Sequence, residues 1–173
     1  MIVSIIYKKL WGIANSLENT KNYDTEGFVE QLEYTVSQIS FFHNVLVPKT
    51  GNVSKTFFDV KGGKPKEGQV AYFNLTRGFP KELYDVHYCY ILKDFESKFL
   101  VIPLTSVKNT SGEPNPKFEF DIKIKNFVND SLSRVHIDEM RILDAQRLIV
   151  EKGYHNVEDK REEIIVKIKS VIF

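Results

Sequence analysis

Residues 69–125 carry the densest β pattern in the chain, and this pattern limits the possible folds more than any other feature. Four segments combine β-branched and aromatic residues with apolar–polar alternation: 69–75 (QVAYFNL), 85–94 (DVHYCYILKD), 98–106 (KFLVIPLTS) and 117–125 (KFEFDIKIK). Residues 134–144 (RVHIDEMRILD) are a further strand candidate. Because so few short strands would leave open edges, the pattern predicts a small curled barrel.

Helical patterns precede and follow this β segment. In residues 1–47, apolar side chains recur every three or four positions, and Asp24 or Thr25 is suited to cap the second helix. At the C-terminus an apolar stripe runs from Ile164 to Ile172, and Asn156 is the expected N-cap of that helix. We therefore predict an α+β fold with a helical N-terminal extension and a C-terminal helix.

The composition divides the chain into three parts and excludes several classes of site. Residues 1–47 are the helical extension, residues 48–66 are rich in Pro, Gly and Lys and form a linker or arm, and residues 67–173 form the barrel domain. One cysteine and four scattered histidines give no zinc or calcium signature, so we expect no metal and no cofactor. No segment is apolar enough for a membrane span, so we expect a cytoplasmic protein without a membrane partner.

An ordered set of short motifs resembles the PemK/MazF family of toxins from toxin–antitoxin systems. In order, the motifs are GQVAYFNL from Gly68, Glu82 followed by HYCYIL, VIPLTS ending at Ser106, and DEMRILDAQRL from Asp138. The match covers roughly residues 67–173. The chain departs from the family where it has His87-Tyr88 instead of the usual Arg-Pro, and RGFPKELYD instead of a Gly-Ser-Glu-Gln loop.

The resemblance implies a small SH3-like β-barrel and a metal-independent endoribonuclease that cuts single-stranded RNA. It also implies a homodimer and a cognate antitoxin protein as partner. Under this hypothesis the 2′-hydroxyl attacks the adjacent phosphate and leaves a cyclic phosphate. The helical extension has no counterpart in the short members of the family.

Three residues are the candidate catalytic groups. His87 stands at the family's arginine position, and its pKa near neutrality suits proton transfer. Thr105, at the end of a predicted strand, would hydrogen-bond a phosphate oxygen. Arg77 would supply the positive charge that position 87 lacks. The plain structural alternatives are a strand histidine bonded to a neighbour, a threonine in a strand-ending turn, and a solvated loop arginine.

The candidate RNA-binding residues are Phe79, Lys81, Glu82, Ser106 and Lys108. From Lys61 to Lys81, five basic residues and one acidic residue give a local charge of +4, which would attract a phosphate backbone. Phe79, in a Gly-Pro loop, is the best candidate for stacking on an unpaired base. Two other functions remain open: a catalytically inactive barrel that binds RNA or protein, and a poison of DNA gyrase with the same fold.

Overall fold

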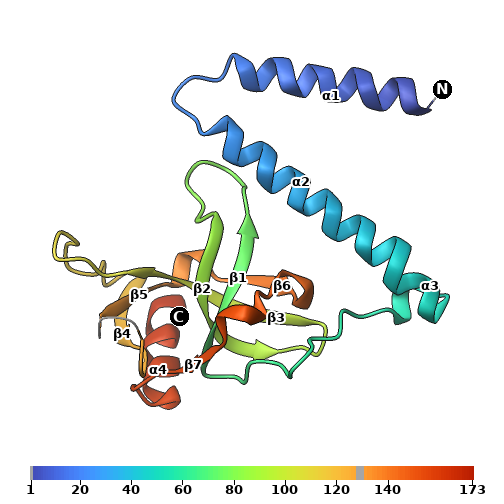
Figure 1. Ribbon diagram of the computed structural model, residues 1–173. Coiled ribbons are helices and arrows are strands. Elements are labelled where there is room, and N and C mark those ends of the chain that lie inside the picture. The colour runs from blue at the N-terminus through green and yellow to red at the C-terminus, as the bar shows by residue number, and fades with distance from the viewer. Residues whose placement is uncertain (1, 128–130) are drawn as a thin grey trace.

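The computed structural model describes residues 2–127 and 131–173 and confirms an α+β architecture (Figure 1). The longer helices are α1 (Ile2–Glu18), α2 (Thr25–Phe41) and α4 (Arg161–Ile172), and a short α3 (Val47–Thr50) follows α2. The strands are β1 (Gln69–Thr76), β2 (Asp85–Asp94), β3 (Lys98–Ser106), β4 (Glu119–Lys123), β5 (Leu132–His136), β6 (Arg141–Asp144) and β7 (Tyr154–Asn156). They form one seven-stranded antiparallel sheet.

The sheet has the order β4-β5-β3-β2-β1-β7, and β6 pairs with β3. Residues 134–144, predicted as one strand, are in fact the end of β5 and the whole of β6, with a 3-10 turn at Ile137–Glu139 between them. Because of this turn, β5 pairs with the end of β3 at Leu104–Ser106, whereas β6 pairs with its beginning at Lys98–Val101. Ile137, in the turn, is buried in the core. At the sheet's outer edges β4 and β7 come together, where a single bridge pairs Ile124 with Val157.

Two hydrophobic clusters hold the sheet, one on each side. Phe73, Cys89 and Phe99 belong to the first cluster, whereas Tyr90 and Ile102 belong to the second. Adjacent residues of β2 thus point to opposite sides, as strand geometry requires. Cys89 is fully buried, and this burial raises the pKa of its thiol well above the usual range.

Helix α4 packs against the second cluster through Ile164 and Ile168, as the apolar stripe predicted. The expected N-cap was wrong, because the helix begins at Arg161 and is preceded by Lys160. Asn156 instead ends β7, where its side-chain oxygen accepts a hydrogen bond from Gln69 Nε2 at 3.0 Å. The cross-strand bond holds Asn156 in the sheet and removes it from the helix.

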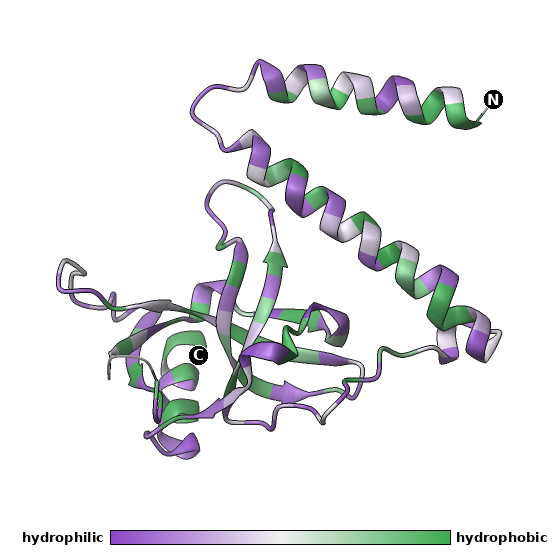
Figure 2. Cartoon of the chain, in the orientation of Figure 1, coloured by the Kyte–Doolittle hydropathy of each residue, from purple (hydrophilic) through white to green (hydrophobic). Residues whose placement is uncertain are grey.

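The N-terminal helices extend away from the sheet (Figure 1). Asp24 caps α2 as predicted, since its carboxylate accepts a hydrogen bond from Gly27 N at 3.0 Å. Neither α1 nor α2 contains a buried residue, and the hydropathy colours of Figure 2 show apolar residues along both. None of the described helices combines the length and apolar character that crossing a bilayer demands.

Candidate active site

A cleft opens where β2 and β3 separate. Their ladder ends at the pair Cys89↔Pro103, and proline has no N–H with which to continue it. Beyond this point β2 remains paired with β1, while β3 pairs through Leu104–Ser106 with β5. The resulting cavity, of about 420 Å³, is lined by Tyr72, Val86, His87, Tyr88, Leu104, Thr105, Ser106 and Lys108.

His87 bridges β2 and β3 just beyond the point where the two strands separate. Its Nδ1 lies 3.1 Å from the carbonyl oxygen of Leu104, on the opposite strand. A carbonyl can only accept, so Nδ1 carries the proton and donates it. In the neutral imidazole, Nε2 is therefore the nitrogen with a free lone pair. His87 thus connects the two separated strands by a hydrogen bond and is also a potential proton acceptor.

Thr105 is the first member of a hydroxyl–imidazole–carboxylate chain. Its Oγ1 lies 2.8 Å from Nε2 of His136 in β5. On the other side of the ring, His136 Nδ1 lies 3.4 Å from Glu119 Oε1 in β4. Because His136 and Glu119 are directly opposite each other in the β4–β5 ladder, the sheet itself fixes this alignment.

Burial lowers the pKa of His136, and the nearby carboxylates of Glu119, Asp138 and Glu139 oppose that shift. The neutral ring is therefore favoured over the charged one. In the neutral form, Nδ1–H faces Glu119 and Nε2 accepts the Thr105 proton. When the ring is protonated, Nε2–H donates to Thr105, and the hydroxyl proton is free to point into the cleft.

Aromatic rings continue the cleft on one side. Tyr72 and Tyr88, a cross-strand pair that also lines the cavity, have ring centroids 4.6 Å apart. Phe127 and His155 pack edge-on against Tyr88, at 4.8 and 5.6 Å. Lys152 Nζ lies 5.9 Å from the Tyr72 centroid. Such a cluster beside a polar cleft can stack on flat unsaturated rings.

Charge at the cleft is unevenly distributed. Lys108 is the one residue with a full positive charge among those that line the cavity. Arg134 lies opposite Thr105 in the β3–β5 ladder, but its Nε is 2.9 Å from Asp121 Oδ1, so that charge is neutralised locally. The positive charge available to an anion therefore comes from Lys108 in the lining and from Lys152 beside Tyr72.

Arg77 lies outside the cavity. Its guanidinium contacts Asp85 at 2.7 Å and Asp24 at 2.9 Å, and the hydrogen bonds to Asp85 and Asp24 raise its pKa above the usual range. These contacts connect the cap of α2 to the start of β2. The structure therefore places Arg77 at the junction between the extension and the sheet.

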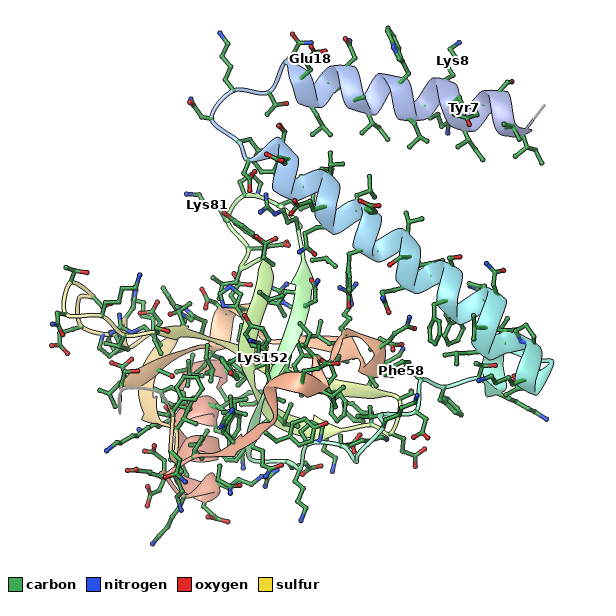
Figure 3. The ribbon with its side chains drawn as sticks, in the orientation of Figure 1. Tyr7, Lys8, Glu18, Phe58, Lys81 and Lys152 are labelled. Carbon is green, nitrogen blue, oxygen red and sulfur yellow. The ribbon has the colours of Figure 1, made fainter. Side chains whose placement is uncertain are left out.

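The β1–β2 loop keeps three other predicted residues away from the cleft. Phe79 is 79% exposed, and Glu82 Oε2 accepts a hydrogen bond from the Phe79 backbone at 3.3 Å. Lys81 is exposed on the same loop (Figure 3). The cavity thus brings together His87, Thr105, Ser106 and Lys108, but not Arg77, Phe79, Lys81 or Glu82.

Sequence analysis missed His136, Glu119 and Tyr72. His136 lies 31 positions from Thr105, and no local spacing motif joins the two. Only the β3–β5 and β4–β5 registers bring the hydroxyl, imidazole and carboxylate into contact. Within residues 2–127 and 131–173, no three side chains of histidine, cysteine, aspartate or glutamate are grouped to hold a metal ion.

Comparison with known proteins finds no family model that matches the chain and no curated relative. The geometry of the cleft and the motifs in the sequence are therefore the basis for assigning a function.

Proposed function

We propose that this chain is a metal-independent endoribonuclease of the PemK/MazF type that cleaves single-stranded RNA at the cleft between β2 and β3. The observation that carries the proposal is the meeting of two imidazole groups and a hydroxyl around this cleft. His87 lines it directly, and His136 reaches it through Thr105. An acid and a base on either side of a phosphate are what internal attack by a 2′-hydroxyl requires.

The proposed reaction uses each group once. His87 Nε2 takes the proton of the 2′-hydroxyl, and the 2′-oxygen bonds to phosphorus. The bond from phosphorus to the 5′-oxygen breaks, and that oxygen receives the Thr105 hydroxyl proton. This transfer requires the less populated form in which His136 is protonated, because burial favours the neutral ring, and the imidazolium then returns a proton from Nε2 to Thr105. The products are a 2′,3′-cyclic phosphate and a free 5′-hydroxyl.

The surroundings of the cleft favour a single-stranded substrate. Lys108 provides a cation for one phosphate, and Tyr72 and Tyr88 provide ring faces for a base. Bases of a duplex are stacked on each other and cannot use such faces. We further propose that the sheet is the SH3-like barrel, closed where Lys125 N donates to Asn156 O and Glu158 N donates to Lys123 O, each at 2.8 Å.

The direct test is to incubate the purified chain with a long RNA in excess EDTA and to map the new ends. We expect discrete cuts with cyclic phosphate termini, and loss of these cuts in His87→Ala and in Thr105→Val. His43→Ala is the matched control, because His43 lies in the helical extension, outside the cleft. Cuts that persist in both cleft variants would place the activity elsewhere or in a contaminant.

Two other results would select the competing functions. RNA binding without cleavage would indicate that the cleft is a binding module. Growth arrest on expression, with intact RNA but damaged DNA, would indicate a gyrase poison. A cognate antitoxin remains a prediction of the resemblance, and co-expression rescue of arrested cells would test it.

A further inference from the structure

A second cavity lies between helix α2 and the sheet, near the end of β1 (Figure 1). It has a volume of about 270 Å³ and is lined by α2, by the π-helical turn Phe42–Leu46, by the ends of β1 and β6 and by the 3-10 turn Ala145–Arg147. Gln146 Nε2 connects the two walls, donating to the backbone oxygen of Gln38 at 2.8 Å and to its side-chain oxygen at 2.9 Å. The cavity shares no lining residue with the cleft between β2 and β3. We call it the α2–sheet pocket.

Apolar and aromatic side chains form the wall that the helix contributes. Ile39 is 56% exposed, Tyr34 is half-buried, and the half-buried ring of Phe42 lies edge-on to His43 at a centroid distance of 5.4 Å. Short π-helical turns such as the one at Phe42 are frequent at functional sites. The volume lies just below the range of roughly 300 to 1,000 Å³ that is typical for drug-sized ligands. A smaller molecule therefore fits.

Arg147 brings a positive charge to this pocket. Its Nη1 donates to the carbonyl oxygen of Asn74 at 3.3 Å and to Thr76 Oγ1 at 3.2 Å, and both acceptors are uncharged. Within residues 2–127 and 131–173, no carboxylate forms an ion pair with Arg147, whereas Arg77 and Arg134 are each paired with an aspartate. A half-buried guanidinium without a counter-ion is suited to bind an anion.

Three other titratable side chains line the pocket. Burial raises the pKa of Tyr34, and the positive charge of Arg147 opposes that shift, so the phenol keeps its proton and can donate a hydrogen bond. Asp144 is exposed and accepts a hydrogen bond from Gln146 N at 2.9 Å, which holds it in a local turn. His43 is exposed at the aromatic wall. The pocket therefore combines two donors with an apolar surface.

The backbone is strained where β1 reaches the pocket. The φ angle of Thr76 is 59°, in the left-handed region that a β-branched residue rarely adopts. The β1–β2 register also shifts between Asn74 and Thr76. A hydrogen bond from Thr76 N to Asn74 Oδ1, at 2.7 Å, and the one from Arg147 to Thr76 Oγ1 stabilise this conformation. Such strain and such strand irregularities are concentrated at ligand-binding and active sites.

We propose that the α2–sheet pocket binds a small carboxylic acid with a flat apolar body. The carboxylate accepts hydrogen bonds from Arg147 and Tyr34, and the body packs on Ile39 and Phe42. Because the ligand contacts both walls, it holds α2 against the sheet. The proposal concerns a site outside the cleft and does not rest on the proposed nuclease activity.

A carboxylate fits the pocket better than a phosphate group. Arg147 is the one fully charged cation among the described residues of the lining, and the lining also includes Asp144, so a dianion would be incompletely neutralised. The apolar wall at Ile39 and Phe42 offers no donors for further phosphate oxygens, and burying oxygens without donors is unfavourable. A single negative charge with an apolar remainder matches both properties.

Isothermal titration calorimetry of the full chain with phenylacetate tests the proposal. We expect a dissociation constant on the order of 0.1 to 1 mM, which a ligand of about ten non-hydrogen atoms can reach. Phenylacetamide is the matched ligand, because it has nearly the same shape without the charge, and it should bind at least about tenfold more weakly. Inorganic phosphate should also bind more weakly than phenylacetate.

Two substitutions locate the site. Arg147→Gln should weaken phenylacetate binding at least about tenfold, and Ile39→Trp should weaken it similarly by filling the pocket while the cation stays in place. Ile39 is exposed on α2, so its replacement should leave the fold intact even if Arg147→Gln does not fold. Arg161→Gln is the matched control, since Arg161 begins α4 and lies outside the pocket. Circular dichroism checks the fold of each variant.

Amide hydrogen exchange provides a second readout of the position. Saturating phenylacetate should slow exchange in residues 34–43 at least about threefold, because the ligand holds this part of α2 against the sheet. Absence of binding up to about 10 mM phenylacetate, equal affinity for phenylacetamide, or unchanged affinity of Ile39→Trp overturns the proposal. Tighter binding of phosphate than of phenylacetate also overturns it and assigns the pocket to a phosphorylated ligand.

Discussion

Nε2 of His136 lies 2.8 Å from the hydroxyl oxygen of Thr105, and the other nitrogen of the same ring faces Glu119. The same three groups, in the order hydroxyl, imidazole and carboxylate, activate nucleophiles or move protons in many hydrolytic enzymes. Here the three residues come from β3, β5 and β4, which are neighbours in the sheet. The chain of contacts is therefore as rigid as the sheet itself.

Replacing His136 should abolish most of the proposed cleavage. We expect His136→Gln to lower the single-turnover rate by about 10² to 10⁴, the usual effect of losing a proton-transfer group. Glu119→Gln should cost less, because the glutamate contacts only the ring and not the hydroxyl. If the two variants are combined, the losses should not add, since both act through Thr105. Additive losses would contradict a single proton path.

His136 should also make the fold sensitive to acid. Burial lowers its pKa below 6.5, so between that lowered value and 6.5 the unfolded chain binds more protons than the folded one. Stability should therefore fall as the pH decreases through this window. In His136→Gln this part of the pH dependence should be absent in urea titrations. An unchanged slope would mean that the ring is not held neutral.

Lys108 should control the salt dependence of RNA binding. We expect Lys108→Gln to weaken binding of a short single-stranded RNA and to lower the slope of log K against log salt by about 0.7, the value for one lost phosphate contact. Lys117→Gln is the control, because Lys117 is also exposed but does not line the cavity. Equal effects of the two substitutions would indicate nonspecific attraction. Fluorescence anisotropy at several salt concentrations measures both.

Helix α4 should contribute strongly to stability through its inner face. Ile164 is 1% exposed within the second cluster, so Ile164→Ala should cost about 2 to 5 kcal/mol in the free energy of unfolding. Val166, two positions along, is 65% exposed, and Val166→Ala should change stability by less than about 0.5 kcal/mol. Chemical denaturation of both variants gives the comparison. Similar losses would show that α4 packs on a different face.

Strands β1 to β4 and the helices α1, α2 and α4 followed from the sequence because their signals are local. Alternation identified β1 to β4, and a side-chain oxygen at Asp24 marked the start of α2. The N-cap prediction for Asn156 was wrong because it also relied on a local signal. An asparagine side chain can cap a helix or bond a neighbouring strand, and the local sequence does not distinguish the two. Its bond with Gln69 joins residues 87 positions apart, which no local pattern contains.

The candidate site could be predicted only in part. His87 and Thr105 are both two residues beyond the paired Cys89 and Pro103, so adjacent strands were enough to bring them together. Arg77 was assigned to the site because it is a cation in a nearby loop. Its two carboxylate partners come from different elements, and one of them, Asp24, lies 53 positions away. Long-range ion pairing of this kind has no sequence signature.

The buried position of Cys89 has a practical consequence for work on this molecule. It is the sole cysteine in the chain, and its enclosed, high-pKa thiol is a poor nucleophile. A second cysteine introduced on the surface would therefore react with a maleimide dye while the native one stays unlabelled. Site-specific fluorophores or spin probes can thus be attached without first removing the natural residue.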